Sequence, residues 1–141
     1  MNERIILGII GSVGSMVAGL FGGWSTGLEV LCVFILVDFV TGILVGATGH
    51  SKKSEAGGIS SRVIWVGIMH KILELTMVII GYELDQLIGA NYIRDAVVIA
   101  YIVTETISII ENCGLIGVPV PSIIMKVIDV LKNKNNNTKV E

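Results

Sequence analysis

The sequence predicts an all-α integral membrane protein with four, or alternatively three, transmembrane helices and a short amphipathic helix near the C-terminus. Three observations predict this class. Apolar residues make up 52% of the 141 residues and charged residues only 16%, against about 25% charged residues in an average protein. Mean hydropathy is +0.80. The apolar residues are gathered in four runs, each close to the roughly 20 residues that a helix needs to cross a bilayer.

These four runs place the transmembrane region within residues 1–112. The spans are expected at about residues 5–24, 28–46, 63–81 and 95–110. A tight turn at Ser25–Gly27 separates the first two, a polar loop the second and third, and residues 82–94 the third and fourth. In the three-span alternative, the first helix lies on the membrane surface or outside the bundle.

Residues 113–133 are predicted to form a proline-containing loop and an amphipathic helix. Pro121 followed by Ser122 is typical of a helix start. Apolar residues then recur at helical spacing, at Ile124, Val127, Ile128 and Leu131. We expect this helix either in the membrane interface or packed on the end of the bundle. Residues 134–141 are predicted to be a disordered tail, because their polar composition cannot bury a core.

The placement of lysine and arginine predicts the orientation in the membrane. With four spans, both termini and the loop after the second span share one side. That side carries every lysine and arginine except Arg94, on the opposite side, and Lys71, inside the third span. Because positive residues are enriched in cytoplasmic loops, the N- and C-termini of this multi-pass protein are expected in the cytoplasm.

Polar residues inside the spans are the candidate functional residues. His70, Lys71 and Glu74 lie close enough along the third span to contact each other on one helix face. A lysine or aspartate at the centre of a span costs about 2.5–3.5 kcal/mol on the insertion scale. Such residues therefore indicate a functional site, and the alternative is a static network of ion pairs between helices. The predicted intramembrane polar network, or pore lining, consists of Asp38, His70, Lys71, Glu74, Tyr101, Glu105, Ser108 and Asn112.

Small residues predict where helices pack closely. Glycine and serine recur every four residues along the first span, a spacing that lets helix backbones approach in lipid. A second small pair lies beside Asp38 in the second span. The predicted packing residues are Gly11, Ser15, Gly19, Gly23, Thr41 and Gly42.

Several classes of chemistry have no motif in the sequence. There is no nucleophile elbow, no phosphate-binding glycine loop and no cluster of metal-ligand type. Cys32 and Cys113 are interpreted as small buried hydrophobic residues. We therefore expect a protein that is not an enzyme and has no cofactor. The net charge of −2 favours no nucleic-acid partner.

Three stretches together resemble the toxin-secretion/phage-lysis holin family, found in phages of Gram-positive bacteria. They are VDFVTGIL at residues 37–44, GGISSRVIWVGIMHK at 57–71 and YIVTETISIIENCGLIGVPVPSIIMKVIDVLK at 101–132. The positions that match the family pattern include three in the loop before the last helix. They are Asp38, Thr41, Gly42, Glu105, Ser108, Asn112, and the loop residues Gly117, Pro119 and Pro121.

The resemblance implies a phage holin in the bacterial cytoplasmic membrane. Such a protein forms homo-oligomers in the lipid bilayer, opens a pore that releases an endolysin or a toxin, and triggers host cell lysis. An antiholin would be a further partner. Two alternatives stay open from the residues themselves. One is a small ion or proton channel or transporter that uses the charged residues as a relay, and the other is a non-conducting antiholin or adaptor.

Overall fold

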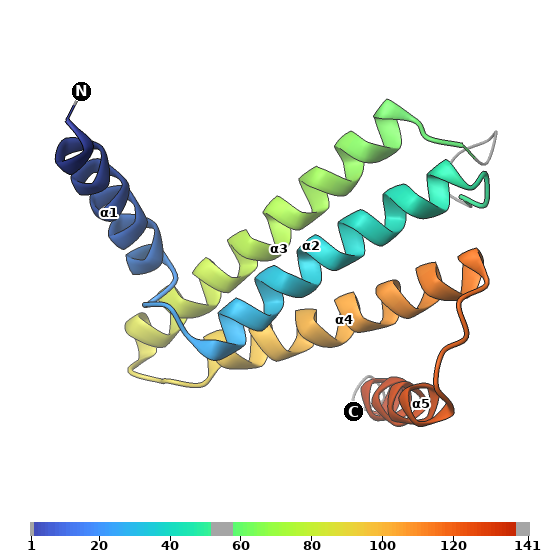
Figure 1. Cartoon of the computed structure of the whole chain (residues 1–141). Helices are drawn as coiled ribbons and strands as arrows, with labels where there is room; N and C mark the ends of the chain where they lie inside the picture. Colours follow the sequence, from blue (N-terminus) through green and yellow to red (C-terminus); the bar gives the residue numbers. More distant parts are fainter. Residues whose placement is uncertain (1, 52–57, 138–141) are drawn as a thin grey trace.

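The computed structural model describes residues 2–51 and 58–137, and it consists of helices joined by short connections (Figure 1). There is no β-strand among these residues, so the predicted all-α class is confirmed. In chain order the helices are α1 (Glu3–Leu20), α2 (Thr26–Ala47), α3 (Ser61–Ile88), α4 (Ile93–Ile116) and α5 (Ser122–Asn137).

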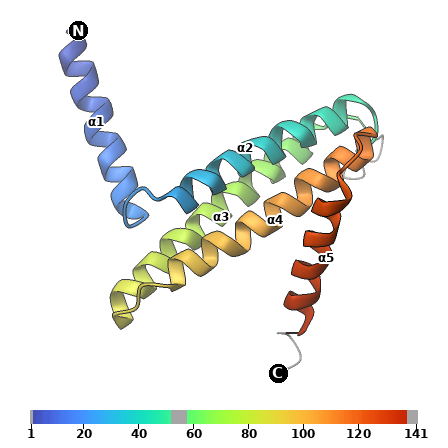
Figure 2. The ribbon, with the colours of Figure 1, turned by 60° about the horizontal axis from the view of Figure 1, so that its bottom comes forward.

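Helices α2, α3 and α4 form an antiparallel bundle, whereas α1 and α5 diverge from it at opposite ends (Figures 1 and 2). Helix α4 packs along both α2 and α3, and the direct contact between α2 and α3 is small. Helices α1, α2 and α3 are each long and apolar enough to cross a membrane. Helix α4 is not among these three candidates, but its 24 residues give it a length of about 36 Å beside α2 and α3. The number of spans, three or four, stays a prediction.

Two helix ends differ from the predicted spans. Helix α1 ends at Leu20, four residues before the predicted boundary, because Gly22 and Gly23 adopt φ of +76° and +93°, which a right-handed helix cannot contain. Helix α3 continues seven residues beyond residue 81 and ends at Ile88, because the following Gly89 adopts φ of +69°. The predicted connection over residues 82–94 therefore shrinks to a short turn before α4.

Arg94 ties the two turns at one end of the bundle together. Its Nη1 donates hydrogen bonds to the backbone oxygens of Phe21, at 3.1 Å, and Gly22, at 3.2 Å. The ring of Tyr82 lies directly against Gly22, where any side chain would overlap it. Ser25 caps the start of α2 by accepting a hydrogen bond from the Leu28 amide. These contacts define the turn end of the bundle.

The apolar core lies near this turn end. Its fully buried members come from all three bundle helices, and six half-buried residues surround them, including Phe21, Cys32 and Tyr101. The buried members are Leu28, Leu31, Val78 and Val98. Most other large apolar side chains of α1, α2 and α3 point outward, as expected for helices in lipid rather than in water.

The opposite end of the bundle carries the turn into α5. Gly117 ends α4 with φ of +84°, and the Val118 amide reaches back to the Cys113 oxygen at 3.0 Å. Helix α5 starts after Pro121 and runs to Asn137, so residues 134–137 of the predicted tail are helical. The rest of that tail, 138–141, and the loop lysines Lys52 and Lys53 lie outside the described residues.

Candidate functional site: a polar layer at the middle of the bundle

Lys71 joins the three helices of the bundle near their midpoints. Its Nζ lies 2.8 Å from Asp38 Oδ2 on α2 and 2.5 Å from Glu105 Oε2 on α4. It also lies 2.6 Å from the other oxygen of Glu105, so that it bridges both oxygens of this carboxylate. The pair of Lys71 with Asp38 links α3 to α2, two helices that otherwise touch little.

Asn112 extends the network along α4 toward α2. Its Nδ2 donates to Asp38 Oδ1 at 3.1 Å and to Thr41 Oγ1 at 3.0 Å. A hydrogen bond from Nδ2 to the Asp38 backbone oxygen, at 3.5 Å, is longer. Asp38 is therefore held from two sides, by a cation of α3 and an amide of α4. We call Asp38, Lys71, Glu74, Glu105 and Asn112, together with Thr41, the polar layer.

Glu74 is the weakly bound member of the polar layer. Its Oε1 is 3.8 Å from Lys71 Nζ, one helical turn away on α3, which is too long for a hydrogen bond. Its Oε2 is buried and has no hydrogen-bond partner. One ammonium group thus faces three carboxylates, two at short distance and one at long distance. The layer is short of positive charge.

The polar layer is well shielded from the surroundings of the chain. The Glu105 side chain is 1% exposed, and those of Asp38, Glu74 and Lys71 are between 11% and 16% exposed. In such a setting, removing one partner of an ion pair leaves an uncompensated charge, and the cost is typically about 3–5 kcal/mol. The three helices are therefore strongly coupled through Lys71.

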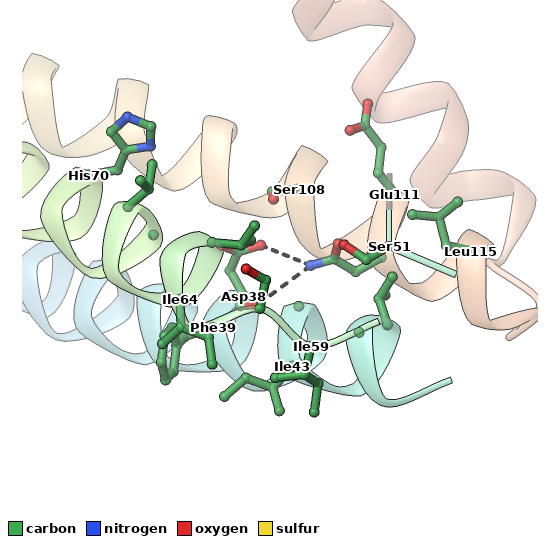
Figure 3. Close-up of a pocket in the computed structure, with 18 of the residues that line it drawn as sticks. Asp38, Phe39, Ile43, Ser51, Ile59, Ile64, His70, Ser108, Glu111 and Leu115 are labelled. Atoms are coloured by element: carbon green, nitrogen blue, oxygen red, sulfur yellow. Dashed lines mark hydrogen bonds between the residues drawn. The ribbon is translucent and has the colours of Figure 1, made fainter. Parts of the chain in front are cut away.

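A groove opens beside the polar layer toward the α5 end of the bundle (Figure 3). Its volume is about 1170 Å³, and it lies where α3 stands away from α2 and α4. Asp38, Lys71 and Asn112 belong to its lining, together with His70 and residues 58–60 before α3. The dashed lines in Figure 3 mark the bonds that reach Asp38. The groove thus gives access to the Asp38, Lys71 and Asn112 side of the polar layer.

Three of the predicted network residues lie outside the polar layer. His70 is exposed and lines the groove, one residue before Lys71 but on a different side of α3. Ser108 also lines the groove. Tyr101 packs against the apolar core near the turn end. The predicted network residues of α4 are therefore divided: Glu105 and Asn112 are buried in the polar layer, and Tyr101 and Ser108 lie elsewhere.

The predicted packing residues also separate into two groups. Thr41 and Gly42 lie where α2 meets α4, and a side chain at Gly42 would stand 3.9 Å from Asn112 Nδ2. Gly11 and Gly19 face no other part of the described chain within 4 Å, and Ser15 is exposed. Gly23 lies past the end of α1, in the turn. The packing of α1 against another helix stays a prediction.

Asp85 and Arg94 have structural roles that the sequence did not predict, since both lie in the predicted connection over residues 82–94. Asp85 lies in the last turns of α3 and accepts backbone hydrogen bonds from Tyr92, Ile93 and Arg94 at 2.9–3.1 Å. It thereby caps the start of α4 from another helix. Asp85 is eight residues before the start of α4 in the sequence, so its spacing gave no signal of this cap, which depends on the turn between the two helices.

The arrangement provides a charged, hydrogen-bonded layer inside a bundle with an apolar exterior. No group of three or more histidine, cysteine, aspartate or glutamate side chains among the described residues has the arrangement of a metal site. What the layer can do is hold the three helices together through charge. If the helices separate, it can also expose carboxylate and amide groups to water.

Comparison with known proteins supplies the family. The sequence profile of the bacteriophage holin family matches residues 15–133. A probable holin of Bacillus phage phi105 is 29% identical over 110 residues, which are 77% of this chain and 76% of that protein.

Bacterial proteins of similar length match over more of the chain. An uncharacterised protein of Clostridium perfringens is 35% identical over 134 residues, covering 94% of this chain and 93% of that protein. One of Listeria monocytogenes is 35% identical over 136 residues, covering 96% and 91%. No solved structure matches the chain with significance. With the family profile matching most of its length, this chain belongs to the bacteriophage holin family.

Proposed function

We propose that this chain is a holin that oligomerises in the bacterial cytoplasmic membrane and opens a pore for an endolysin or a toxin, which leads to host cell lysis. Family membership and the similarity to a probable phage holin support this role. The observation that carries the proposal is the polar layer, which gives a small bundle with an apolar exterior a set of interior groups suited to line a pore.

In the proposed closed form, Asp38, Glu105 and Asn112 find their partners inside one chain, and Glu74 is the weakly bound exception. The bundle then presents apolar side chains to lipid, among them Leu36 of α2 and Leu73 of α3, which are 62% and 59% exposed. Charged groups in the hydrocarbon region are stable only when they are paired or wet. The closed form meets this condition for Asp38 and Glu105, which both pair with Lys71.

In the proposed open form, α3 moves away from the pair α2 and α4. This direction is favoured because α2 packs closely on α4, while α3 contacts α2 little except through Lys71. The groove already separates α3 from its neighbours over its first turns. Movement of α3 would uncover Asp38, Glu105 and Asn112. Several copies would then arrange these faces around water, since one chain is too small to enclose a wide lumen.

The termini and the α5 end of the bundle are placed in the cytoplasm in this proposal. Lysine and arginine are concentrated there, as the positive-inside rule requires. An endolysin in the cytoplasm would approach the same side of the membrane. An antiholin would act by joining the closed form and delaying its opening.

The test is inducible expression of the full chain in a bacterial host that also makes a murein hydrolase without an export signal. We expect growth to stop abruptly at a reproducible time, the membrane potential to collapse and the hydrolase to reach the cell wall. Continued growth with an intact potential would contradict the pore, and altered timing only beside a second holin would indicate an antiholin.

A small channel built on the same charged residues is the competing function. Liposomes that contain the purified protein, a small dye and a labelled folded protein separate the two. A holin releases both cargoes, whereas a channel or transporter carries ions and releases neither. Release of ions alone would therefore contradict a holin pore and support an ion channel or transporter that uses Lys71, Glu74 and Glu105 as a relay.

A further inference from the structure

Helix α5 exposes an apolar face that no other part of the described chain covers. Its described side chains are all exposed, and the large apolar ones are 38–66% exposed. They are Ile123, Ile124, Met125, Val127 and Val130. None of the described side chains of α5 is therefore buried against the end of the bundle, the alternative expected for this helix.

The direction of α5 is set by the turn after α4. Gly117 ends α4 in a left-handed conformation, and Pro121 accepts backbone hydrogen bonds from Ile124 and Met125 at the start of α5. Figure 1 shows α5 nearly end-on while the bundle runs across the view, and Figure 2 shows it turned steeply away from α4. The two views therefore show that α5 leaves the line of α4 instead of continuing it.

The residues of α5 are sorted by helical spacing into two arcs. Ile123, Val127 and Val130 fall on one arc, and Lys126 and Asp129 on the other. The polar arc carries two lysines, Lys126 and Lys132, against one aspartate, so its net charge is +1, whereas Lys134 falls on the apolar side at the end of the helix. Basic residues next to an apolar face are typical of helices that lie on anionic lipid.

The length of α5 excludes a further span. Its 16 residues correspond to about 24 Å, shorter than the roughly 30 Å of a hydrocarbon core. Only residues 117–121 connect it to α4, so it cannot move far from the membrane boundary at which α4 ends. The apolar face is therefore held at the depth where headgroups meet acyl chains.

We propose that α5 lies in the cytoplasmic interface of the bilayer, with its apolar arc in the acyl chains and its lysines among anionic headgroups. The occupant of the apolar face is lipid rather than a second copy of the chain. This assignment is independent of whether the protein forms a pore, because it concerns the closed, membrane-inserted form.

The experiment places one environment-sensitive fluorophore at a time on the full chain in liposomes of phosphatidylcholine and phosphatidylglycerol. The background carries Cys32→Ala and Cys113→Ala. Labels enter through Ile124→Cys and Val127→Cys on the apolar arc and, as matched controls, through Lys126→Cys and Asp129→Cys. Variants are kept only if they insert and retain the helical spectrum of the unmodified chain.

We expect blue-shifted emission and quenching by lipid-borne nitroxides at the apolar positions, and quenching by aqueous iodide at the control positions. Liposomes of phosphatidylcholine alone should weaken the difference, because the lysines lose their anionic partners. Equal iodide quenching at all four positions would overturn the proposal. Apolar labels that are shielded from both quenchers, and only at high protein-to-lipid ratio, would overturn it in favour of a second copy.

Discussion

Lys71 of α3 lies between Asp38 of α2 and Glu105 of α4, with its ammonium group within 2.8 Å of both carboxylates. The pairs cross from one helix to two others at about the middle of each. The sequence alone places an i, i+3 partner, Glu74, much nearer along the chain, yet in the structure Glu74 is the most distant of the three carboxylates. The strongest interactions of this lysine are therefore tertiary, and they determine what its replacement should do.

Replacement of Lys71 by methionine should destabilise the closed bundle by about 3–5 kcal/mol, because three carboxylates then lack their cation. We expect a lower melting temperature in nanodiscs and lysis that is early, or absent where the protein fails to accumulate. The double variant Lys71→Met with Glu105→Gln should recover part of the lost stability, since one unpaired charge is also removed.

Glu83→Gln is the matched control for this series, because Glu83 is an exposed carboxylate on the same helix as Lys71. Its melting temperature and lysis time should equal those of the unmodified chain. If Lys71→Met behaved like this control, the ion pairs would have no role in holding α3 to α2 and α4.

Replacement of Asn112 by leucine should cost roughly 1–3 kcal/mol, because Asp38 loses a buried donor and Thr41 keeps only its bond to the Asp38 backbone oxygen. Thermal unfolding of the purified protein measures the change. Thr104→Val on the same helix serves for comparison. Its hydroxyl is exposed and bonds only to the Ala100 oxygen, so the expected effect is small. If both changes lowered the stability equally, the hydrogen bonds of Asn112 to Asp38 and Thr41 would make no special contribution to it.

Gly22→Ala should destabilise the turn end of the bundle. A residue other than glycine at φ of +76° costs about 1–2 kcal/mol, and the new methyl group would overlap the Tyr82 ring. The control is Gly8→Ala within α1, where no atom lies within 4 Å and alanine should favour the helix. Limited proteolysis at the α1–α2 turn should be faster for the first variant alone, and unchanged rates for both would contradict the turn geometry.

Asp85→Ala should loosen the start of α4. The change removes the acceptor of three backbone amides, and loss of a single cap typically costs about 0.5–2 kcal/mol. Hydrogen exchange of the amides of residues 92–94 should accelerate, while exchange at the middle of α4 changes less. Glu83→Ala, two residues earlier and exposed, is expected to leave these amides protected. Protection that persists in Asp85→Ala would show that the cap is dispensable.

The sequence by itself determined that the chain is helical and apolar, and where most of its helices lie. Runs of apolar residues and the glycines that stop a helix act locally, so α2 begins and ends close to the predicted second span. The family also follows from residues read along the chain, since the motif around Asp38 and the one from Glu105 to Asn112 need no coordinates.

Only the tertiary structure decided which polar residues meet. Tyr101 and Glu105 are one turn apart on α4, but one packs on the apolar core and the other binds Lys71. That division depends on the register of α4 against α2 and α3, which is set by side chains such as Leu31 and Val78 that pack between helices. The end of α3 is a second example. The sequence predicted that this span ends at residue 81, but α3 runs on to Ile88, and its Asp85 caps the start of the neighbouring α4. Spacing along one helix limits its possible neighbours, and packing between helices selects among them.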